Sequence, residues 1–459
     1  MKILLTHAYF LMDDIKELEI VKPYPPLGLL YISAFLEKNN ITHKVFDTTF
    51  SKYNLLESFI SDYQPDVIGI YCNLMTKLKV VELMTGIKAV NAKTQIVVGG
   101  PDIRYNASDY LENGADVAVI GEGEVGFLEL IKAFDNADQE LSKINGIAFK
   151  LDGKVHFTKD RILMREIGEL PYPAFHNIDT EKYLETWKKQ HGQSMLSVST
   201  QRGCPYTCKW CSTAVYGQSY RRKNPEKVVE ELMDLKTKFN PDAIWFVDDV
   251  FTVSHKWISA FNLALKKAGQ KIPFECITRA DRLNPEVIEL LKDSGCFRVW
   301  IGAESGSQRI LDAMDRRVEV GQVQEMIQQS KKAGIETGTF IMLGYPGETL
   351  QDIHATVDHL IKSDPDQFTI TLAYPIKGTS LYDEVENLQI GSFDWKTQTD
   401  RERNFERNFS HSFYQFALRY VVNEVRYRQL KAQSNKSLKR ITKHYIKARS
   451  AKILMNLTK

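Results

Sequence analysis

Short apolar segments alternate with amphipathic ones over the first part of this chain. Residues 2–6, 67–71, 96–100 and 117–120 are each short and apolar, and the last two run into glycines. Residues 28–39 follow a Pro-Pro pair and have the spacing of an amphipathic helix. Because parallel strands need helical crossovers between them, this alternation predicts a parallel, doubly wound α/β sheet.

A second alternation begins at Met195. Strands are expected at 197–200, 243–247, 274–278, 298–301, 337–342 and 367–371. Helical segments intervene, for example at 225–239, 285–294 and 320–333. Six βα units predict a partial (β/α)6 TIM-type barrel, and in such barrels the active site lies at the carboxyl ends of the strands.

These patterns divide the chain into four expected regions. A doubly wound domain covers residues 1–140, a connector 141–194, the barrel 195–385, and a basic helical C-terminal region 386–459. Within the connector, Asp152-Gly153 stands between two apolar segments and predicts a β-hairpin.

Composition narrows the class of protein. The chain has 459 residues, of which 43% are hydrophobic, enough for the cores of two or three domains. Its six cysteines are too few and too clustered for a disulfide scaffold, and the N-terminus lacks a signal-peptide profile. No run approaches the ~18 apolar residues of a membrane span. We therefore predict a cytoplasmic protein.

Positive charge is concentrated near the C-terminus. The net charge is +2, yet residues 396–459 contain 16 Lys and Arg against 4 Asp and Glu. Such a region is typical of contact with anionic lipid, nucleic acid or a phosphorylated substrate, or it is a solvated helical face. The spacing of Phe413, Phe416, Leu418 and Val421 predicts an amphipathic stretch that closes over the barrel mouth or touches a membrane surface. No contact with DNA is expected.

Three cysteines, Cys204, Cys208 and Cys211, follow the first strand of the second alternation with C-x3-C-x2-C spacing. Thiolates this close together suit a cubane iron–sulfur cluster. Such a cluster normally has four cysteine ligands, so three leave one iron open to a substrate or cofactor. A structural zinc site is disfavoured, because no second C-x2-C pair or nearby C-x-H pair completes it.

The cysteine motif at the head of six βα units resembles the radical S-adenosylmethionine (SAM) superfamily. The preceding domain carries Pro25-Pro-Leu-Gly28, Val98-Gly-Gly-Pro101 and Gly121-Glu-Gly-Glu124 in that order. It resembles the cobalamin-binding subgroup, which includes methyltransferases and the anaerobic magnesium-protoporphyrin cyclase. The resemblance, which spans about residues 1–385, implies a 4Fe-4S cluster on the three cysteines, SAM on the open iron, and cobalamin.

The resemblance also implies cofactor contacts at the ends of the barrel strands. The expected SAM contacts are Trp210, Asp248, Asp249, Arg279, Glu304, Gly344 and Tyr374. The planar fork of Arg279 suits a carboxylate. Ordinary structural roles stay open, such as a helix N-cap for the paired aspartates and a core position for Trp210.

The expected cobalamin contacts are glycines at the carboxyl ends of the first sheet, namely Gly99, Gly100, Gly121 and Gly123. Tight turns that bind nothing are the alternative. The Asp-x-His-x-x-Gly motif of a lower-axial histidine is absent, and near the N-terminus only His7 and His43 are available. The sequence therefore does not predict a histidine ligand, while the resemblance still implies cobalamin.

The resemblance implies an enzyme that reductively cleaves SAM to a 5′-deoxyadenosyl radical. With cobalamin it would methylate an unactivated carbon or phosphorus of a small-molecule or lipid substrate, and a flavodoxin or ferredoxin would supply the electron. A cobalamin-dependent cyclase or rearrangement enzyme is the main alternative. An RNA methylthiotransferase is disfavoured, because only Cys72 lies upstream of the triad. A non-enzymatic metal-binding module is the last alternative.

Overall fold

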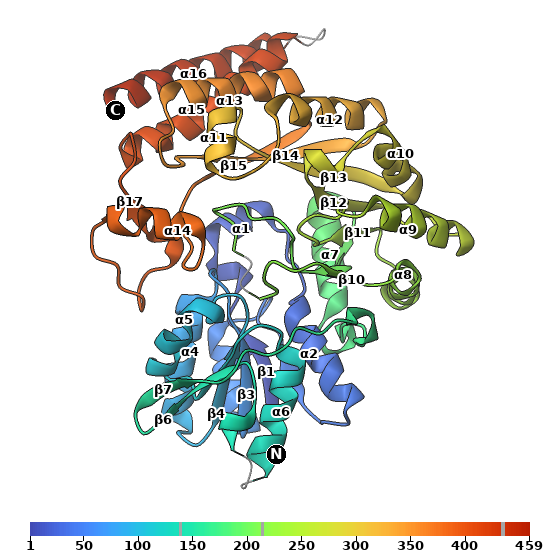
Figure 1. The fold of residues 1–459 in the computed structure, drawn as a ribbon, viewed down its shortest axis with the longest axis vertical. Coiled ribbons are helices and arrows are strands. Elements are labelled where there is room, and N and C mark those ends of the chain that lie inside the picture. Colours follow the sequence, from blue (N-terminus) through green and yellow to red (C-terminus); the bar gives the residue numbers. More distant parts are fainter. Residues whose placement is uncertain (137–139, 213–214, 433–436) are drawn as a thin grey trace. The chain divides into compact units, whose positions relative to one another are not determined.

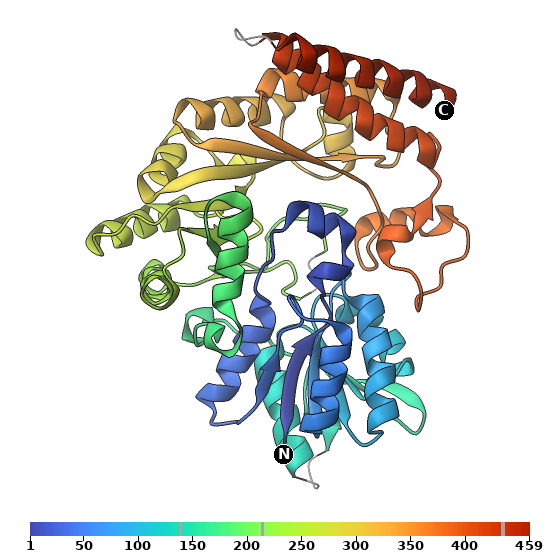
Figure 2. The same cartoon turned by 180° about the vertical axis from the view of Figure 1, so that it is seen from behind.

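A computed structural model describes residues 1–136, 140–212, 215–432 and 437–459 (Figures 1 and 2). The chain forms two compact units. Unit 1 comprises Met1–Pro205, Ser212–Trp245 and Ser392–Glu402, and unit 2 comprises Tyr206–Cys211, Phe246–Gly391 and Arg403–Lys459. The chain passes from one unit to the other inside the cysteine segment, so Cys204 belongs to unit 1, whereas Cys208 and Cys211 belong to unit 2.

Unit 1 contains a seven-stranded sheet. Its strands are β1 (Ile3–His7), β2 (Lys44–Phe46), β3 (Val67–Tyr71), β4 (Gln95–Gly99), β5 (Val117–Val119), β6 (Ile147–Leu151) and β7 (Lys154–Phe157). The spatial order is β2-β1-β3-β4-β5-β6-β7, and the first five strands pair in parallel. The order reverses between β1 and β3, which in doubly wound sheets opens a ligand crevice at the carboxyl ends of the strands.

Helices cover both faces of this sheet. On one face α3 (Tyr53–Tyr63), α4 (Lys77–Val90) and α5 (Ile103–Glu112) share an apolar core with the strands. On the other face α2 (Leu27–Lys38) and α6 (Gly123–Asp135) do the same. The doubly wound α/β prediction is therefore confirmed. The remaining helices of unit 1 are α1 (Ile15–Ile20), α7 (Thr180–His191) and α8 (Pro225–Phe239), and a small ribbon pairs β9 (Gln201–Arg202) with β10 (Arg221–Arg222).

The hairpin at Asp152-Gly153 extends the first sheet. Both residues have positive φ, 49° and 75°, as a two-residue type I′ turn requires. β6 runs antiparallel to β5, so the hairpin continues the N-terminal sheet, whereas the sequence places it in a separate connector. Without the hairpin, β5 would be an edge strand with unpaired backbone groups. Pairing with β6 satisfies those groups, which explains why the hairpin joins this sheet. The short, half-exposed β2 has no sequence signal.

A second sheet has six strands in the order β15-β14-β13-β12-β11-β8. They are β8 (Met195–Val198), β11 (Ala243–Phe246), β12 (Phe274–Thr278), β13 (Cys296–Glu304), β14 (Glu336–Leu343) and β15 (Gln367–Leu372). β12 to β15 pair in parallel within unit 2. The six predicted strands are thus confirmed, although β8 starts earlier than predicted and β13 is much longer, with an irregularity in its pairing at residues 302–304.

Helices alternate with the strands of unit 2. They are α9 (His255–Lys267), α10 (Pro285–Ser294), α11 (Gln308–Ala313), α12 (Val320–Lys332), α13 (Leu350–Ser363) and α14 (Ser380–Val385). Side-chain caps begin several of them; Thr349 and Asp352, for example, form a capping box at α13. Within the described residues, no helix is both long enough and apolar enough to cross a membrane.

The C-terminal region is mainly helical. α15 (His411–Ala432) and α16 (Leu438–Leu457) run side by side, and α15 packs on α13 (Figures 1 and 2). Phe413 and Val421 are buried, whereas Phe416 and Leu418 are only partly so, because the buried stripe of α15 runs through Ala417. A short antiparallel ribbon, β16 (Gln389–Ile390) with β17 (Asn404–Phe405), precedes α15 where no strand is predicted.

Candidate functional site

The loop Tyr206–Cys211 is fastened to the rest of unit 2 through its backbone. The amide of Lys209 donates to the carbonyl of Met314 at 3.1 Å, and the carbonyl of Lys209 accepts from the amide of Leu381 at 2.8 Å. The hydroxyl of Thr207 donates to Asp315 at 2.6 Å. The segment that follows α11 therefore fixes the position of Cys208.

Two buried arginines face the sulfur of Cys208. Arg279 Nη1 lies 3.5 Å and Arg316 Nη1 3.6 Å from Cys208 Sγ, and the two residues are only 2% and 6% exposed. Arg279 also donates to Asp281 at 2.8 Å and to the carbonyl of Arg316 at 2.7 Å. Its guanidinium lies over the ring of Tyr206, 4.0 Å from the centroid. Both guanidiniums therefore direct N–H donors at this sulfur.

Glu304 ends β13 beside the same arginines. Its φ of 64° is in the left-handed region, which is uncommon for a residue with a Cβ and often marks a functional position. Arg316 Nη2 lies 3.8 Å from Glu304 Oε1 and donates to the carbonyl of Gly302 at 2.9 Å. Burial raises the pKa of Glu304, although the charges of Arg316 and Arg279 act in the opposite direction. The end of β13 thus places a carboxyl group beside the arginines that face Cys208.

The other predicted SAM contacts follow their strands as expected. Asp248 is buried after β11, and the pKa of Asp249 is raised, first by burial and then by the negative charge of Asp248. Trp210 packs against a cluster that includes Met342 and Tyr345, so it has a core contact. Tyr374 is half-buried immediately after β15. Their roles toward SAM stay predictions.

Gly344 begins the turn after β14. Its φ is 75°, and its amide donates to the buried carboxyl of Glu348 at 2.7 Å. Its carbonyl accepts from Arg407 Nε at 3.1 Å, and Arg407 also donates to the carbonyl of Ala373 at 2.7 Å. Arg407, from the basic C-terminal region, therefore joins the ends of β14 and β15.

The predicted cobalamin glycines differ in what surrounds them. At Gly100, with φ of 118°, a Cβ would stand 2.3 Å from the carbonyl of Cys72, so the turn requires glycine for packing reasons alone. At Gly123 a Cβ would stand 3.0 Å from Ile32 of α2. At Gly99 and Gly121, by contrast, a Cβ would meet no atom closer than 3.6 Å.

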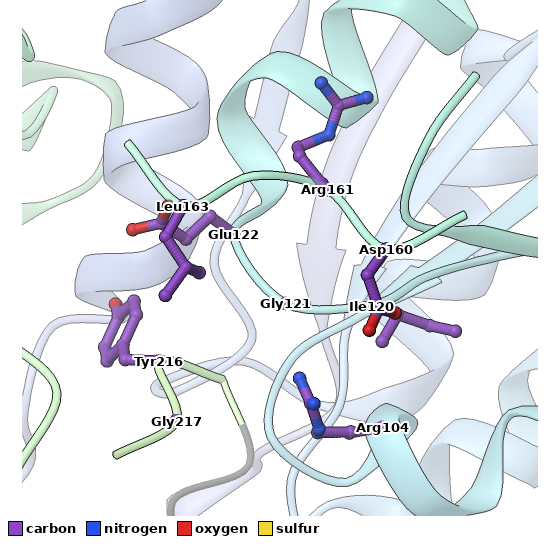
Figure 3. A pocket seen from close by; sticks show the side chains of 9 residues that line it. All are labelled: Arg104, Ile120, Gly121, Glu122, Asp160, Arg161, Leu163, Tyr216 and Gly217. Carbon is purple, nitrogen blue, oxygen red and sulfur yellow. The ribbon is translucent and has the colours of Figure 1, made fainter. Parts of the chain in front are cut away.

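Gly121 lines a hollow of about 210 Å³ in unit 1 (Figure 3). The hollow lies at the carboxyl end of β5, and Arg104, Asp160, Leu163 and Tyr216 surround it. The charged and aromatic side chains beside open backbone suit a polar, flat ligand. Gly121 therefore stands where a ligand of the first sheet is expected, although its φ of 88° already favours glycine there, as the φ and packing of Gly100 do.

A buried ionic cluster in unit 1 was missed by sequence reasoning. Arg202 binds both carboxylates of the Gly121-Glu-Gly-Glu124 turn, with 3.0 Å to Glu122 and a second bond to Glu124. Arg221 also pairs with Glu122, at 2.7 Å. Burial alone would lower the pKa of Arg202, but the charges of Glu124 and Glu122 raise it, so the guanidinium stays charged. Arg202 directly precedes Gly203-Cys204, so this turn holds the start of the cysteine segment.

Both N-terminal histidines use their ring nitrogens within the protein. The His7 ring contacts Asp47 at 2.8 Å and the Thr48 hydroxyl at 3.0 Å. The His43 ring contacts the Ser33 hydroxyl at 2.7 Å and the carbonyl of Ile41 at 3.1 Å. Ligation of a metal by either ring would cost one of these bonds, which agrees with the missing histidine motif.

The side chains of the cysteine segment and the arginines beside it have the chemistry that an iron–sulfur cluster requires. In the part of the chain that the structure describes, no three His, Cys, Asp or Glu side chains are gathered as a ready-made ion site. Three thiols nevertheless stand within eight residues, and two guanidiniums face one of them. Hydrogen bonds to cluster sulfurs are a usual means of tuning such clusters.

We expect Glu124→Gln to destabilise unit 1 by about 3 kcal/mol, because breaking one partner of a buried ion pair leaves an uncompensated charge. Urea unfolding of the purified protein measures the loss. The matched control is Glu230→Gln, which removes a carboxylate from the exposed Lys227–Glu230 pair and should cost about 0–1 kcal/mol. Equal losses in the two variants would contradict the assigned role of the cluster.

A pH profile should separate two carboxyls beside α13. Burial raises the pKa of Glu348 to about 8, so the stability due to this group is present below its ordinary value of 4.5 and is lost as pH rises through 8. Burial acts on Asp352 in the same sense, but hydrogen bonds from Ser307 and Thr349 lower its pKa to about 2. Its stabilising effect is therefore constant above pH 3.8 and is lost only as pH falls through 2.

Thermal unfolding between pH 5 and 8 should show Glu348→Gln gaining stability relative to the native protein as pH rises, by at most about 5 kcal/mol. Asp352→Asn changes a carboxyl at the start of the same helix. Its stability should be lower than that of the native protein by the same amount at every pH between 5 and 8. Parallel profiles for the native protein and Glu348→Gln would show that the Glu348 carboxyl is ionised at neutral pH.

Two family models match the chain. Residues 198–360 match the Radical SAM superfamily and residues 18–131 match the B12 binding domain. The solved cobalamin-dependent SAM radical enzyme OxsB, with aqua-cobalamin and SAM bound, covers 99% of this chain and 72% of its own at a TM-score of 0.77. At 18% sequence identity this likeness shows the fold.

Curated relatives match over most of their length. An uncharacterized methyltransferase of Pyrococcus horikoshii is 30% identical over 82% of both chains. The cytidylyl-2-hydroxyethylphosphonate methyltransferase of Streptomyces wedmorensis is 26% identical over 78% of this chain and 77% of its own. The anaerobic magnesium-protoporphyrin IX monomethyl ester cyclase of Rubrivivax gelatinosus is 25% identical over 82% and 69%.

These matches confirm the family that the cysteine motif and the preceding sheet indicate, and with it the expectation of an enzyme whose cofactors are a 4Fe-4S cluster, SAM and cobalamin. The chain belongs to the B12-binding radical SAM enzymes.

Proposed function

We propose that this enzyme methylates an unactivated carbon, or a phosphorus, of a small-molecule or lipid substrate. The observation that carries the proposal is the presence in one chain of a B12-type sheet and an arginine-held cysteine loop. Two of the curated relatives named above are methyltransferases. When bound, the cluster supplies the electron that cleaves SAM, and cobalamin carries the methyl group.

In this proposal Cys204 of unit 1 and Cys208 and Cys211 of unit 2 hold the cluster and leave one iron open for SAM. The other SAM contacts belong to unit 2. Asp248, Asp249, Glu304, Gly344 and Tyr374 stand at strand ends and bind the polar groups of SAM.

For Arg279 we propose a positioning role. All three of its nitrogens already donate to acceptors in the protein, namely Asp281, Cys208 and the Arg316 carbonyl. Arg279 and Arg316 therefore orient Cys208 and stabilise its negative charge, and a reduced flavodoxin or ferredoxin delivers the electron.

Unit 1 receives cobalamin. Gly99 and Gly121 leave space beside the backbone at the carboxyl ends of β4 and β5, and Gly100 and Gly123 shape the two turns. Because His7 and His43 are bound within the protein, we propose that neither ligates the cofactor.

A cobalamin-dependent cyclisation or rearrangement is the second candidate. The similarity to the cyclase of Rubrivivax gelatinosus favours it, since that relative matches over as much of this chain as the Pyrococcus horikoshii methyltransferase does.

Methyl-labelled SAM separates the two reactions. With the reconstituted enzyme, a chemical reductant and a panel of candidate acceptors, we expect label in the product together with 5′-deoxyadenosine. Unlabelled product accompanied by 5′-deoxyadenosine would assign cyclisation or rearrangement and refute methyl transfer. Cys208→Ala is the control for cluster-dependent cleavage and should form no 5′-deoxyadenosine.

We expect Arg316→Lys to slow SAM cleavage by about 10–100-fold, because Arg316 reaches Cys208 with Nη1 and the Gly302 carbonyl with Nη2, whereas a lysine has a single nitrogen for both. Arg317→Lys is the matched control, since Arg317 is exposed and pairs only with Asp315 among the described residues. The electron paramagnetic resonance spectrum of the reduced cluster should change in the first variant and not in the second. Identical spectra and rates would remove Arg316 from the site.

A further inference from the structure

Helix α16 has an apolar stripe that faces away from the fold. Ile446, Ile453 and Leu457 are 57%, 60% and 76% exposed, and their spacing of seven and four residues places them on one face of the helix. The opposite face buries Ala448 and Met455 against the rest of unit 2. α16 is therefore apolar on two sides, and only one of them has a partner in the described structure.

Positive charge flanks this stripe. α16 contains six cations and no acidic residue: Lys439, Arg440, Lys443, Lys447, Arg449 and Lys452. Arg449 turns inward and pairs with the buried Glu424 at 3.5 Å. Lys439, Lys443 and Lys447 are exposed on the side of Ile446, and within the described residues none of the three pairs with a carboxylate. The outward face thus combines aliphatic side chains with uncompensated lysines.

A basic hollow of about 350 Å³ lies where α15 meets this end of α16. Arg426, Gln429, Leu430, Arg440 and His444 line it. Burial lowers the pKa of His444, and the surrounding cations, beginning with Lys443 and Lys447, lower it further. The hollow therefore has a positive potential, but it lies toward α15 and not beside the exposed stripe, because the His444 ring contacts Asn423 of α15 at 3.0 Å.

We propose that α16 docks this enzyme on an anionic lipid surface. The stripe Ile446–Ile453–Leu457 enters the boundary between headgroups and acyl chains, and the exposed lysines beside it contact lipid phosphates. Lipid fits better than nucleic acid, because exposed aliphatic side chains have nothing to bind on a phosphate backbone. Docking on lipid also explains why these exposed positions are aliphatic, since a helix face that contacts only water does not require aliphatic side chains.

The test is co-sedimentation of the full-length holoenzyme with vesicles. We expect binding to vesicles of 70% phosphatidylcholine and 30% phosphatidylserine and none to pure phosphatidylcholine. Lys439→Gln, Lys443→Gln and Lys447→Gln combined should weaken binding on the order of a hundredfold, since each lysine near an anionic surface contributes about a factor of five. Ile446→Ser with Ile453→Ser should also weaken binding. Added salt should weaken vesicle binding of the native protein more than that of the lysine variant, because the variant has lost the cations that salt screens.

The matched control changes three exposed lysines on other helices of unit 2, Lys256→Gln, Lys267→Gln and Lys332→Gln. It should bind like the native protein. Equal loss in the control, equal binding to neutral vesicles, or no binding to either vesicle would overturn the proposal. An acidic protein is the alternative occupant of this face. The rate of electron transfer from reduced flavodoxin, measured for the same variants, tests that alternative. If only that rate falls in the α16 lysine variant, the face binds an acidic protein and the lipid proposal is wrong.

Discussion

Two buried guanidiniums on one sulfur are the interaction on which unit 2 depends. Arg279 donates to the backbone carbonyl of Arg316, and both guanidiniums lie within 3.6 Å of the Cys208 sulfur, where two like charges would repel strongly without anions beside them. Asp281 and Glu304 face these guanidiniums and equal them in number. The Cys208 sulfur accepts from both arginines, and hydrogen bonds to sulfur are a usual means of tuning an iron–sulfur cluster.

Unit 1 applies the same principle at the other end of the cysteine segment. Arg202 stands directly before Gly203 and is neutralised by two carboxylates of the β5–α6 turn. Gly203 has a φ of 82°, and a Cβ there would meet Ser219 at 2.3 Å, so the backbone is tightly confined as well. The turn that ends β5 therefore both borders the hollow of the B12-type sheet and anchors the chain that leads to Cys204. A ligand in that hollow and the start of the cluster loop share one structural element.

Much of this could be read from the sequence, because its signals are local. Alternating apolar segments predicted both sheets. The family resemblance placed Arg279 and Glu304 at strand ends, and both contact Arg316. Arg316 was missed because it lies in an irregular connection between α11 and α12, where no periodicity marks a residue as inward-facing. The pairing of Arg202 with Glu124 was missed because the two are distant in sequence and each reads as an ordinary surface charge.

The basic C-terminal region shows why a sum of charges is a weak guide to function. Counted together, its cations suggest one solvated or binding surface, yet Arg407 is partly buried and bonded to the carbonyls of Gly344 and Ala373. Burial lowers the pKa of Arg407 to about 10, as expected for a cation that has lost most of its water. That arginine joins the ends of two strands, and its guanidinium nitrogens bond within the protein. The lysines Lys439, Lys443 and Lys447 of α16 are exposed beside exposed aliphatic side chains, so cations of one region have different surroundings and different uses.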